Sequence, residues 1–202
     1  MSPQSEQLAQ AWAAIEAGHY AEAEALLRAD TTPEGRHALG YAYTFAGNFG
    51  AARAVYQQLC QAAKGEADEH RYLHQLGMVE REAGDHAAAL ALFEQERKLI
   101  ERQGLGPLEC AVNGYELALS RHALGQEREA HAALADAFAE AVTADDATTL
   151  GCLWRLAGDF ARADDNAEAA QDAYTHARTH FAAAEDTAAV EEIQGRLAGL
   201  ER

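Results

Sequence analysis

The chain has 202 residues, of which 49% are hydrophobic and 24% are charged, and its formal net charge is -17. That charge opposes direct binding to nucleic-acid phosphates or to anionic lipid, so we expect neither nucleic acid nor a membrane as a partner. No window of 18 apolar residues occurs, and Met1-Ser2-Pro3-Gln4 lacks the basic-then-apolar start of a signal peptide, which predicts a cytoplasmic protein.

The whole chain is expected to be helical, because alanine is its dominant residue and few segments alternate with period 2. The last segment carries an apolar face at helical spacing, which predicts a C-terminal capping helix. Only three prolines occur and no stretch of linker composition interrupts the chain, so a single domain is expected over 1–202. In chain order, the predicted helices span 4–17, 20–29, 34–46, 49–63, 68–83, 86–103, 108–123, 126–142, 146–163, 166–183 and 186–200.

Five related copies of one short pattern recur along these helices. A complete copy has a small residue in a first helix, a turn residue, and an Ala-x-x-x-large motif in a second helix. Repetition of this kind indicates a stacked solenoid, because one such unit cannot bury its own apolar face. The small residues are Gly40, Gly77, Ala118 and Gly158, the turn residues are Gly18, Gly47, Gly84, Gly125 and Asp165, and the second-helix motifs begin at Ala23, Ala52, Ala89, Ala130 and Ala170.

This pattern resembles the signature of the tetratricopeptide repeat (TPR) family, W-x-x-L-G-x-x-Y, then A-x-x-x-F, then P, over about 34 residues. The resemblance implies an all-α fold, a right-handed α-solenoid of about five helix-turn-helix repeats with a C-terminal capping helix. Turn residues are 29 positions apart from Gly18 to Gly47 but 41 apart from Gly84 to Gly125. The longer copies are similar to the extended repeats of bacterial transcriptional regulators, signalling ATPases and peptide-sensing receptors. The repeats are expected near 4–33, 34–66, 68–106, 108–145 and 147–183, with the cap near 186–200.

Glycine is expected to have two roles in the repeats. Gly40, Gly77 and Gly158 lack a side chain where a first helix lies close against its second helix. The turn glycines supply a positive φ, which is inexpensive only for glycine. Asp165 replaces the turn glycine of the fifth copy, and Asn166 is expected to cap the helix that follows. The large residues expected to fill the space between stacked helix pairs are Tyr43, Tyr56, Phe93 and Tyr174.

Two histidine pairs have the i, i+4 spacing that a helical zinc site requires: His70 with His74, and His176 with His180. Neither pair has a third ligand marked by spacing, and no H-E-x-x-H motif occurs. We therefore expect solvated or partner-facing histidines, with no metal and no cofactor.

The sequence offers few candidates for a catalytic nucleophile. Cys60, Cys110 and Cys152 form no C-x-x-C motif, and their odd number favours buried, free thiols in a reducing compartment. Ser120 is the only serine outside the N-terminal segment, and no G-x-S-x-G motif surrounds it. No catalytic residue is predicted.

In the TPR family the first helix of each repeat lines a concave groove, so a partner would contact what remains on those helices after the core positions are used. Aromatic, methionine and arginine side chains, which are enriched where proteins bind each other, gather on that face. Packing of Tyr41 and Leu119 against neighbouring helices is the alternative. The predicted partner-binding groove consists of His37, Tyr41, Phe45, Arg71, His74, Met78, Arg81, Tyr115, Leu119, His122, Arg155 and Arg162.

These observations favour a non-enzymatic scaffold that binds another protein or a peptide segment in the groove. The alternative is a ligand- or peptide-sensing module of a larger bacterial transcriptional or signalling regulator. The lysine-and-asparagine clamp of chaperone-binding TPR proteins has no counterpart at the corresponding positions, which carry His37, Tyr41, His74 and Met78. A homo-oligomer is compatible with the sequence but is not indicated by it.

Overall fold

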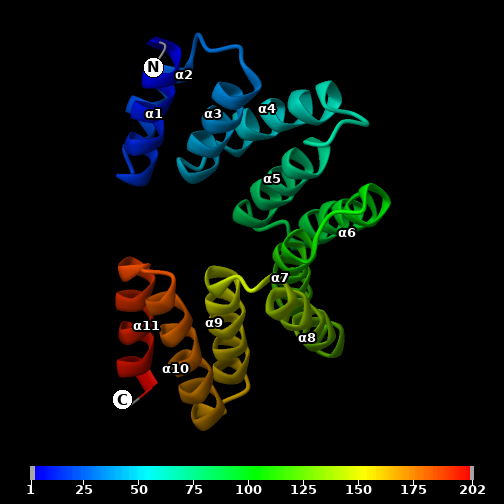
Figure 1. The fold of residues 1–202 in the computed structure, drawn as a ribbon, viewed down its shortest axis with the longest axis vertical. Helices are drawn as coiled ribbons and strands as arrows, with labels where there is room; N and C mark the ends of the chain where they lie inside the picture. Colours follow the sequence, from blue (N-terminus) through cyan, green and yellow to red (C-terminus); the bar gives the residue numbers. More distant parts are fainter. Residues whose placement is uncertain (1–2, 201–202) are drawn as a thin grey trace. The chain divides into compact units, whose positions relative to one another are not determined.

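The computed structural model describes residues 3–200, and over that range every regular element is an α-helix (Figure 1). The observed helix bounds lie within two residues of the predicted ones, so the all-α prediction is confirmed. The helices are α1 (Pro3–Glu16), α2 (Tyr20–Leu27), α3 (Pro33–Phe45), α4 (Phe49–Ala62), α5 (Glu69–Glu82), α6 (His86–Gln103), α7 (Pro107–Ala123), α8 (Glu127–Ala144), α9 (Ala147–Ala163), α10 (Ala167–Ala183) and α11 (Thr187–Leu200).

The chain forms two compact units, and the division lies within α6, between Leu99 and Ile100. In the first unit α1 packs on α2 and α3 on α4, and the first helices α1, α3 and α5 contact one another in series. In the second unit α7 pairs with α8 and α9 with α10, while α7 also contacts α9 and α11 packs on α10. Each unit therefore has the stacked helix pairs of a solenoid. The expectation of one domain over 1–202 stays a prediction.

The turns have the backbone conformation that the sequence predicts. The four turn glycines have φ values between +71° and +83°, in the left-handed region. Asp165 adopts the same region with φ 57°, and Asn166 caps α10 by accepting a hydrogen bond from the Ala169 N–H at 3.1 Å. Asp145 and Glu185 are also left-handed, at the loops that precede α9 and α11. The repeat pattern does not mark these two positions.

The close contact between paired helices is a glycine packed against an aromatic ring. A Cβ atom at Gly40 would lie 2.7 Å from the Tyr56 ring, and one at Gly77 would lie 2.6 Å from Phe93. The same contact recurs between Gly158 and Tyr174. These fully buried rings therefore fill the space within their own helix pair, whereas the sequence pattern predicts them between pairs. A ring of this size leaves room only for glycine on the opposite helix.

The second-helix alanines of all five motifs are fully buried, as predicted. The prediction for the capping helix is confirmed for α11: Ile193 is fully buried, and Val190, Leu197 and Leu200 pack partly buried against the α10 core. All three cysteines are free thiols, but each is only half-buried and none is a core residue. No helix in residues 3–200 has the length and apolar character needed to cross a membrane.

Candidate partner-binding face

Five aromatic side chains form a continuous surface on the first unit, which we call the aromatic strip. The ring centroids of Trp12 and Tyr41 are 5.5 Å apart, and those of Tyr41 and Phe45 are 4.6 Å apart. None of the five side chains is fully buried, and Phe45 keeps 37% of its surface exposed. Trp12, Tyr20 and Tyr41 pack partly buried against the core of the first unit, so only part of each ring, together with Phe45, remains open to solvent. Its members are Trp12 from α1, Tyr20 from α2, and His37, Tyr41 and Phe45 from α3.

The helix period places three of these side chains together. His37, Tyr41 and Phe45 are four residues apart, so they lie along one face of α3. Trp12 reaches that face from α1, with its ring 5.9 Å from His37, and Tyr20 stacks on Phe45 at 6.5 Å. The predicted α3 residues are thus brought together, and two aromatic side chains that the prediction omitted extend their surface.

Two polar groups of the aromatic strip, His37 and Tyr41, are neutral at pH 7. Burial lowers the pKa of the His37 imidazole, and the nearby Arg71 guanidinium lowers it further, so His37 is neutral. Its buried Nδ1 has no hydrogen-bond partner among residues 3–200. Burial raises the pKa of the Tyr41 phenol, and Tyr20 and the Glu82 carboxylate raise it further. Glu82 therefore contributes negative potential at the edge of the strip.

The predicted arginines of the first unit already have acidic partners. Arg71 Nη1 lies 2.9 Å from Asp68 Oδ1, and Arg81 Nη1 lies 3.0 Å from Glu82 Oε1. Each guanidinium is thus partly neutralised by a carboxylate, Asp68 just before α5 or Glu82 within α5. The positive face expected along α5 is therefore much weaker than the arginine count suggests.

His74 lies between α5 and α6, against the second helix of its own pair. Its Nδ1 is 3.1 Å from both carboxylate oxygens of Glu96, and its ring packs on Phe93 with centroids 5.6 Å apart. His74 is therefore held by its own helix pair rather than solvated, and its place in the partner-binding groove stays a prediction. Met78, one turn further along α5, is half-buried.

The second unit exposes an apolar surface along α7, which we call the α7 strip. Four side chains share one face of this helix, because they lie at intervals of four, three and four residues. They are Leu108, Val112, Tyr115 and Leu119. Leu108 is 39% exposed and Val112 is 37% exposed, whereas Tyr115 and Leu119 are half-buried. Burial raises the pKa of Tyr115, and the nearby Arg155 guanidinium lowers it in part.

Alternating charges attach α11 to α9. Arg155 Nη1 lies 2.9 Å from Glu192 Oε2, and Glu192 Oε1 lies 2.8 Å from Arg196 Nη2. Arg196 also pairs with Asp159, which accepts a hydrogen bond from the Tyr174 hydroxyl at 2.7 Å. Burial raises the pKa of Glu192, but Arg196 and Arg155 outweigh this effect and hold the pKa below its ordinary value. Arg155 is therefore engaged by α11.

The other two predicted residues of the second unit also have internal contacts. The His122 ring stacks on Phe160 with centroids 4.1 Å apart, and its Nδ1 lies 2.7 Å from Glu127 Oε2. Arg162 is exposed at the end of α9, near the Tyr174 phenol. Among residues 3–200 it forms no ion pair, unlike the other three predicted arginines.

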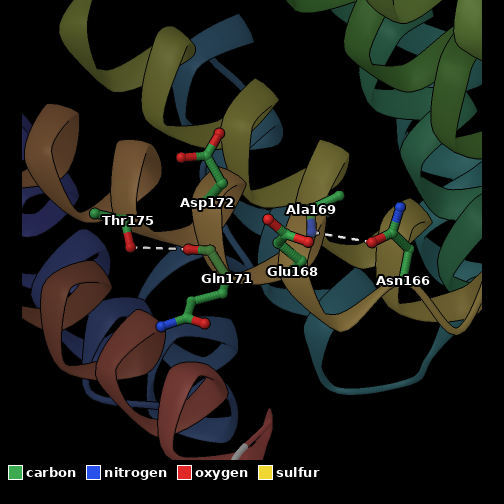
Figure 2. Close-up of a pocket in the computed structure, with 6 residues that line it drawn as sticks. All are labelled: Asn166, Glu168, Ala169, Gln171, Asp172 and Thr175. Atoms are coloured by element: carbon green, nitrogen blue, oxygen red, sulfur yellow. Dashed lines mark hydrogen bonds between the residues drawn. The ribbon is translucent and has the colours of Figure 1, made fainter.

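A shallow depression on α10 lies outside the predicted face (Figure 2). Its hydrogen bonds belong to the helix itself: Asn166 accepts from the Ala169 N–H, and Thr175 Oγ1 donates to the Gln171 carbonyl oxygen at 2.8 Å. Side chains that satisfy their own helix in this way do not assemble a ligand site. The depression is lined by Asn166, Glu168, Ala169, Gln171, Asp172 and Thr175.

Metal-ligating and nucleophilic side chains are dispersed. Within residues 3–200, no three histidine, cysteine or acidic side chains come together as a metal site requires. The Nδ1 atom of His70 lies 2.8 Å from the Ala67 carbonyl oxygen, so that histidine contacts its own backbone. Burial raises the pKa of Cys60 to about 11, and it also raises the pKa of Cys152. Both thiols are protonated at neutral pH and are therefore weak nucleophiles.

Comparisons with known proteins support the fold. Bacillus thuringiensis PlcR, solved in complex with the peptide PapR7 and DNA, is 17% identical, with a TM-score of 0.73 over 94% of this chain and 73% of its own. TTC0263, a thermophilic TPR protein of Thermus thermophilus, is 17% identical, with a TM-score of 0.70 over 98% of both chains. Aspartyl phosphate phosphatase F of Bacillus subtilis is 10% identical, with a TM-score of 0.63 over 98% of this chain and 60% of its own.

Neither a family model nor a curated protein sequence matches the chain. The likeness to solved structures therefore establishes a TPR-type fold, and the predicted resemblance to TPR proteins is confirmed at that level.

Proposed function

We propose that this chain is a non-enzymatic scaffold that binds a segment of another protein on the faces of its first helices. One observation carries the proposal: large apolar side chains remain exposed along α3 and α7, although Leu39 and Leu117 of the same helices are buried. Phe45, Leu108 and Val112 are each more than a third exposed, and each continues into half-buried aromatic neighbours. Exposed apolar surface of this kind marks interaction sites on proteins.

The residues that contribute most to such binding are expected to be few and central. In the first unit these are Tyr41 and Phe45, and in the second unit they are Val112 and Tyr115. Arg71, Arg81 and Arg155 are expected to contribute less, because a partner would have to displace their present carboxylates. His37, Met78, Leu119, His122 and Arg162 would contribute surrounding contact area.

Affinity capture from the native cell, followed by calorimetric titration of the recovered partner, tests the proposal. Phe45→Ser and Val112→Ser should each weaken binding by about 1–2 kcal/mol, which is the effect of truncating a contributing interface residue. Val142→Ser is the matched control for Val112→Ser, because Val142 is 65% exposed at the end of α8 and belongs to neither strip. If Val142→Ser weakens binding as much as Val112→Ser does, the partner docks elsewhere and the proposal fails.

A second candidate function is a peptide-sensing module of a larger bacterial regulator. The likeness to PlcR favours it, since that protein was solved with a bound peptide, and so do the long repeats. A sensing module should be stabilised by its peptide, by roughly 2.7 kcal/mol at one hundred times the dissociation constant. Peptide fractions of native culture medium should then raise the thermal midpoint of the chain, and fractions that leave it unchanged would argue against sensing.

A further inference from the structure

The charges around the aromatic strip are unequal in sign. Glu16 is exposed on α1, four residues beyond Trp12 and therefore on the same helix face. Glu34 is exposed on α3, three residues before His37. Its negative charge contributes to the raised pKa of Tyr72, whose ring lies 6.1 Å from His37. Among the described residues neither carboxylate has an ion-pair partner.

The two arginines of α5 do not balance these two carboxylates. The arginines of α5 are Arg71 and Arg81, and each has a carboxylate about 3 Å away. The partner of Arg71 is Asp68, just before the helix, and the partner of Arg81 is Glu82 within it. His37 is neutral at pH 7. Arg71 and Arg81 are therefore partly neutralised by Asp68 and Glu82, whereas the carboxylates of Glu16 and Glu34 add negative charge at the edge of the strip.

Aromatic rings and carboxylates together favour a cation. The faces of Trp, Tyr and Phe rings carry negative potential and attract Lys and Arg side chains within about 6 Å. Trp12, Tyr41 and Phe45 offer three neighbouring rings, and Glu16 and Glu34 add charge at the edge. The net charge of -17 also repels an acidic partner and accelerates the approach of a basic one.

We propose that the aromatic strip binds a basic segment of another protein, one in which Lys or Arg side chains alternate with apolar residues. This inference rests on the proposed function and specifies its partner for the first unit. The apolar residues of the segment contact the rings, and its cationic side chains lie over ring faces and beside Glu16 and Glu34.

Three synthetic peptides of equal length test the inference directly. They share the same leucine positions and carry Lys and Arg, Gln, or Glu at the remaining positions. Trp154→Phe leaves Trp12 as the only tryptophan of the chain, so its emission reports contact at the strip. The reciprocal variant, Trp12→Phe, keeps only Trp154 in the second unit and should show no response.

The basic peptide should change Trp12 emission and bind at least about tenfold more tightly than the glutamine peptide, a difference of about 1.4 kcal/mol. The glutamate peptide should not bind. Phe45→Leu keeps an apolar side chain but removes the ring face, and it should weaken the basic peptide roughly two- to fivefold. Glu16→Gln combined with Glu34→Gln should weaken it roughly threefold or more and reduce the salt dependence.

A polycation could also bind this acidic chain without using the strip. Glu168→Gln combined with Asp172→Asn removes two exposed carboxylates from α10 and provides the control. If that pair weakens the basic peptide as much as the Glu16 and Glu34 pair does, binding is general electrostatic attraction and the inference is wrong. Absence of any Trp12 response to the basic peptide would also overturn it.

The outcomes separate this inference from the proposed function. If the glutamate peptide changes Trp12 emission and loses affinity with Phe45→Leu, the strip is a binding face but its partner is not basic. If the captured native partner is unaffected by Phe45→Ser and Val112→Ser, the proposed function itself fails, whichever synthetic peptide binds.

Discussion

Gly158→Ala should destabilise the second unit, although alanine is the better helix former. A Cβ atom at position 158 would lie 2.5 Å from two carbon atoms of the Tyr174 ring, far inside van der Waals contact. The ring is fully buried, and its hydroxyl donates a hydrogen bond to Asp159 at 2.7 Å, so it has little freedom to move away. The helices must therefore separate to admit the methyl group.

The size of the effect follows from two opposing contributions. Overpacking a well-packed core costs about 1–3 kcal/mol, and replacing a mid-helix glycine by alanine gains about 0.5–1 kcal/mol. We expect Gly158→Ala to lower the free energy of unfolding by about 1–2 kcal/mol, because the short contact outweighs the gain in helix propensity. Gly195→Ala is the matched control, since a Cβ atom there meets no atom within 4 Å, and it should gain about 0.5–1 kcal/mol.

Urea denaturation followed by far-ultraviolet circular dichroism measures both variants. Stability changes are read from the midpoints, provided that the slope of the transition is unchanged. A midpoint for Gly158→Ala equal to or above that of the wild type would refute the glycine–ring contact. An equal loss in Gly195→Ala would show that the effect is not specific to that contact.

Three further predictions follow from backbone geometry, charge and burial. Gly84→Ala should lower stability by about 1 kcal/mol, since φ is +83° there and the Cβ has open space, whereas Gly50→Ala, with open space and an ordinary φ, should not lower the urea midpoint. Glu192 has a lowered pKa, so its contribution is present at neutral pH and is lost as the pH falls through that pKa; Glu192→Gln should therefore lower the urea midpoint more at pH 7 than at about pH 3.5. Cys60, whose pKa burial raises to about 11, should react with iodoacetamide at about pH 8 much more slowly in the folded chain than in urea, as mass spectrometry would show.

The fold was predictable because its signals are local. Most helices begin or end near a glycine, a proline or an aspartate or asparagine cap, and each buried motif alanine lies five residues after its turn residue. The glycine–aromatic contact was predictable in part. The need for Gly77 was evident from the pattern, but the identity of its partner, Phe93, requires knowing which faces of two helices meet. Gly151, which packs against Phe181, falls outside the repeat signature and gave no signal.

The candidate site was only partly predictable, because its composition depends on contacts between helices. The α3 residues were predictable because the turn at Gly47 sets the register and the helix period then gives the face. Trp12 and Tyr20 lie in the trimmed first copy, whose first helix lacks the Leu-Gly motif that sets the register. Leu108 and Val112 lie one and two turns before Tyr115 on the same helix face, so extending that face towards the start of α7 would have included them.

The arginines show why side-chain type alone is a weak guide to a partner. Arg155 is predicted on the binding face from its position on the first helix of the fifth repeat, and the enrichment of arginine at interfaces supports that choice; it does lie near Tyr115 of the α7 strip. However, α11 stands beside α9 as the next first helix would, and Glu192 neutralises Arg155 while Arg196 neutralises Asp159. A helix predicted only to cover apolar surface thus also satisfies the charges of α9. The surface that we propose for a partner in the second unit is therefore the apolar one along α7, and in the first unit it is the aromatic strip with its acidic edge.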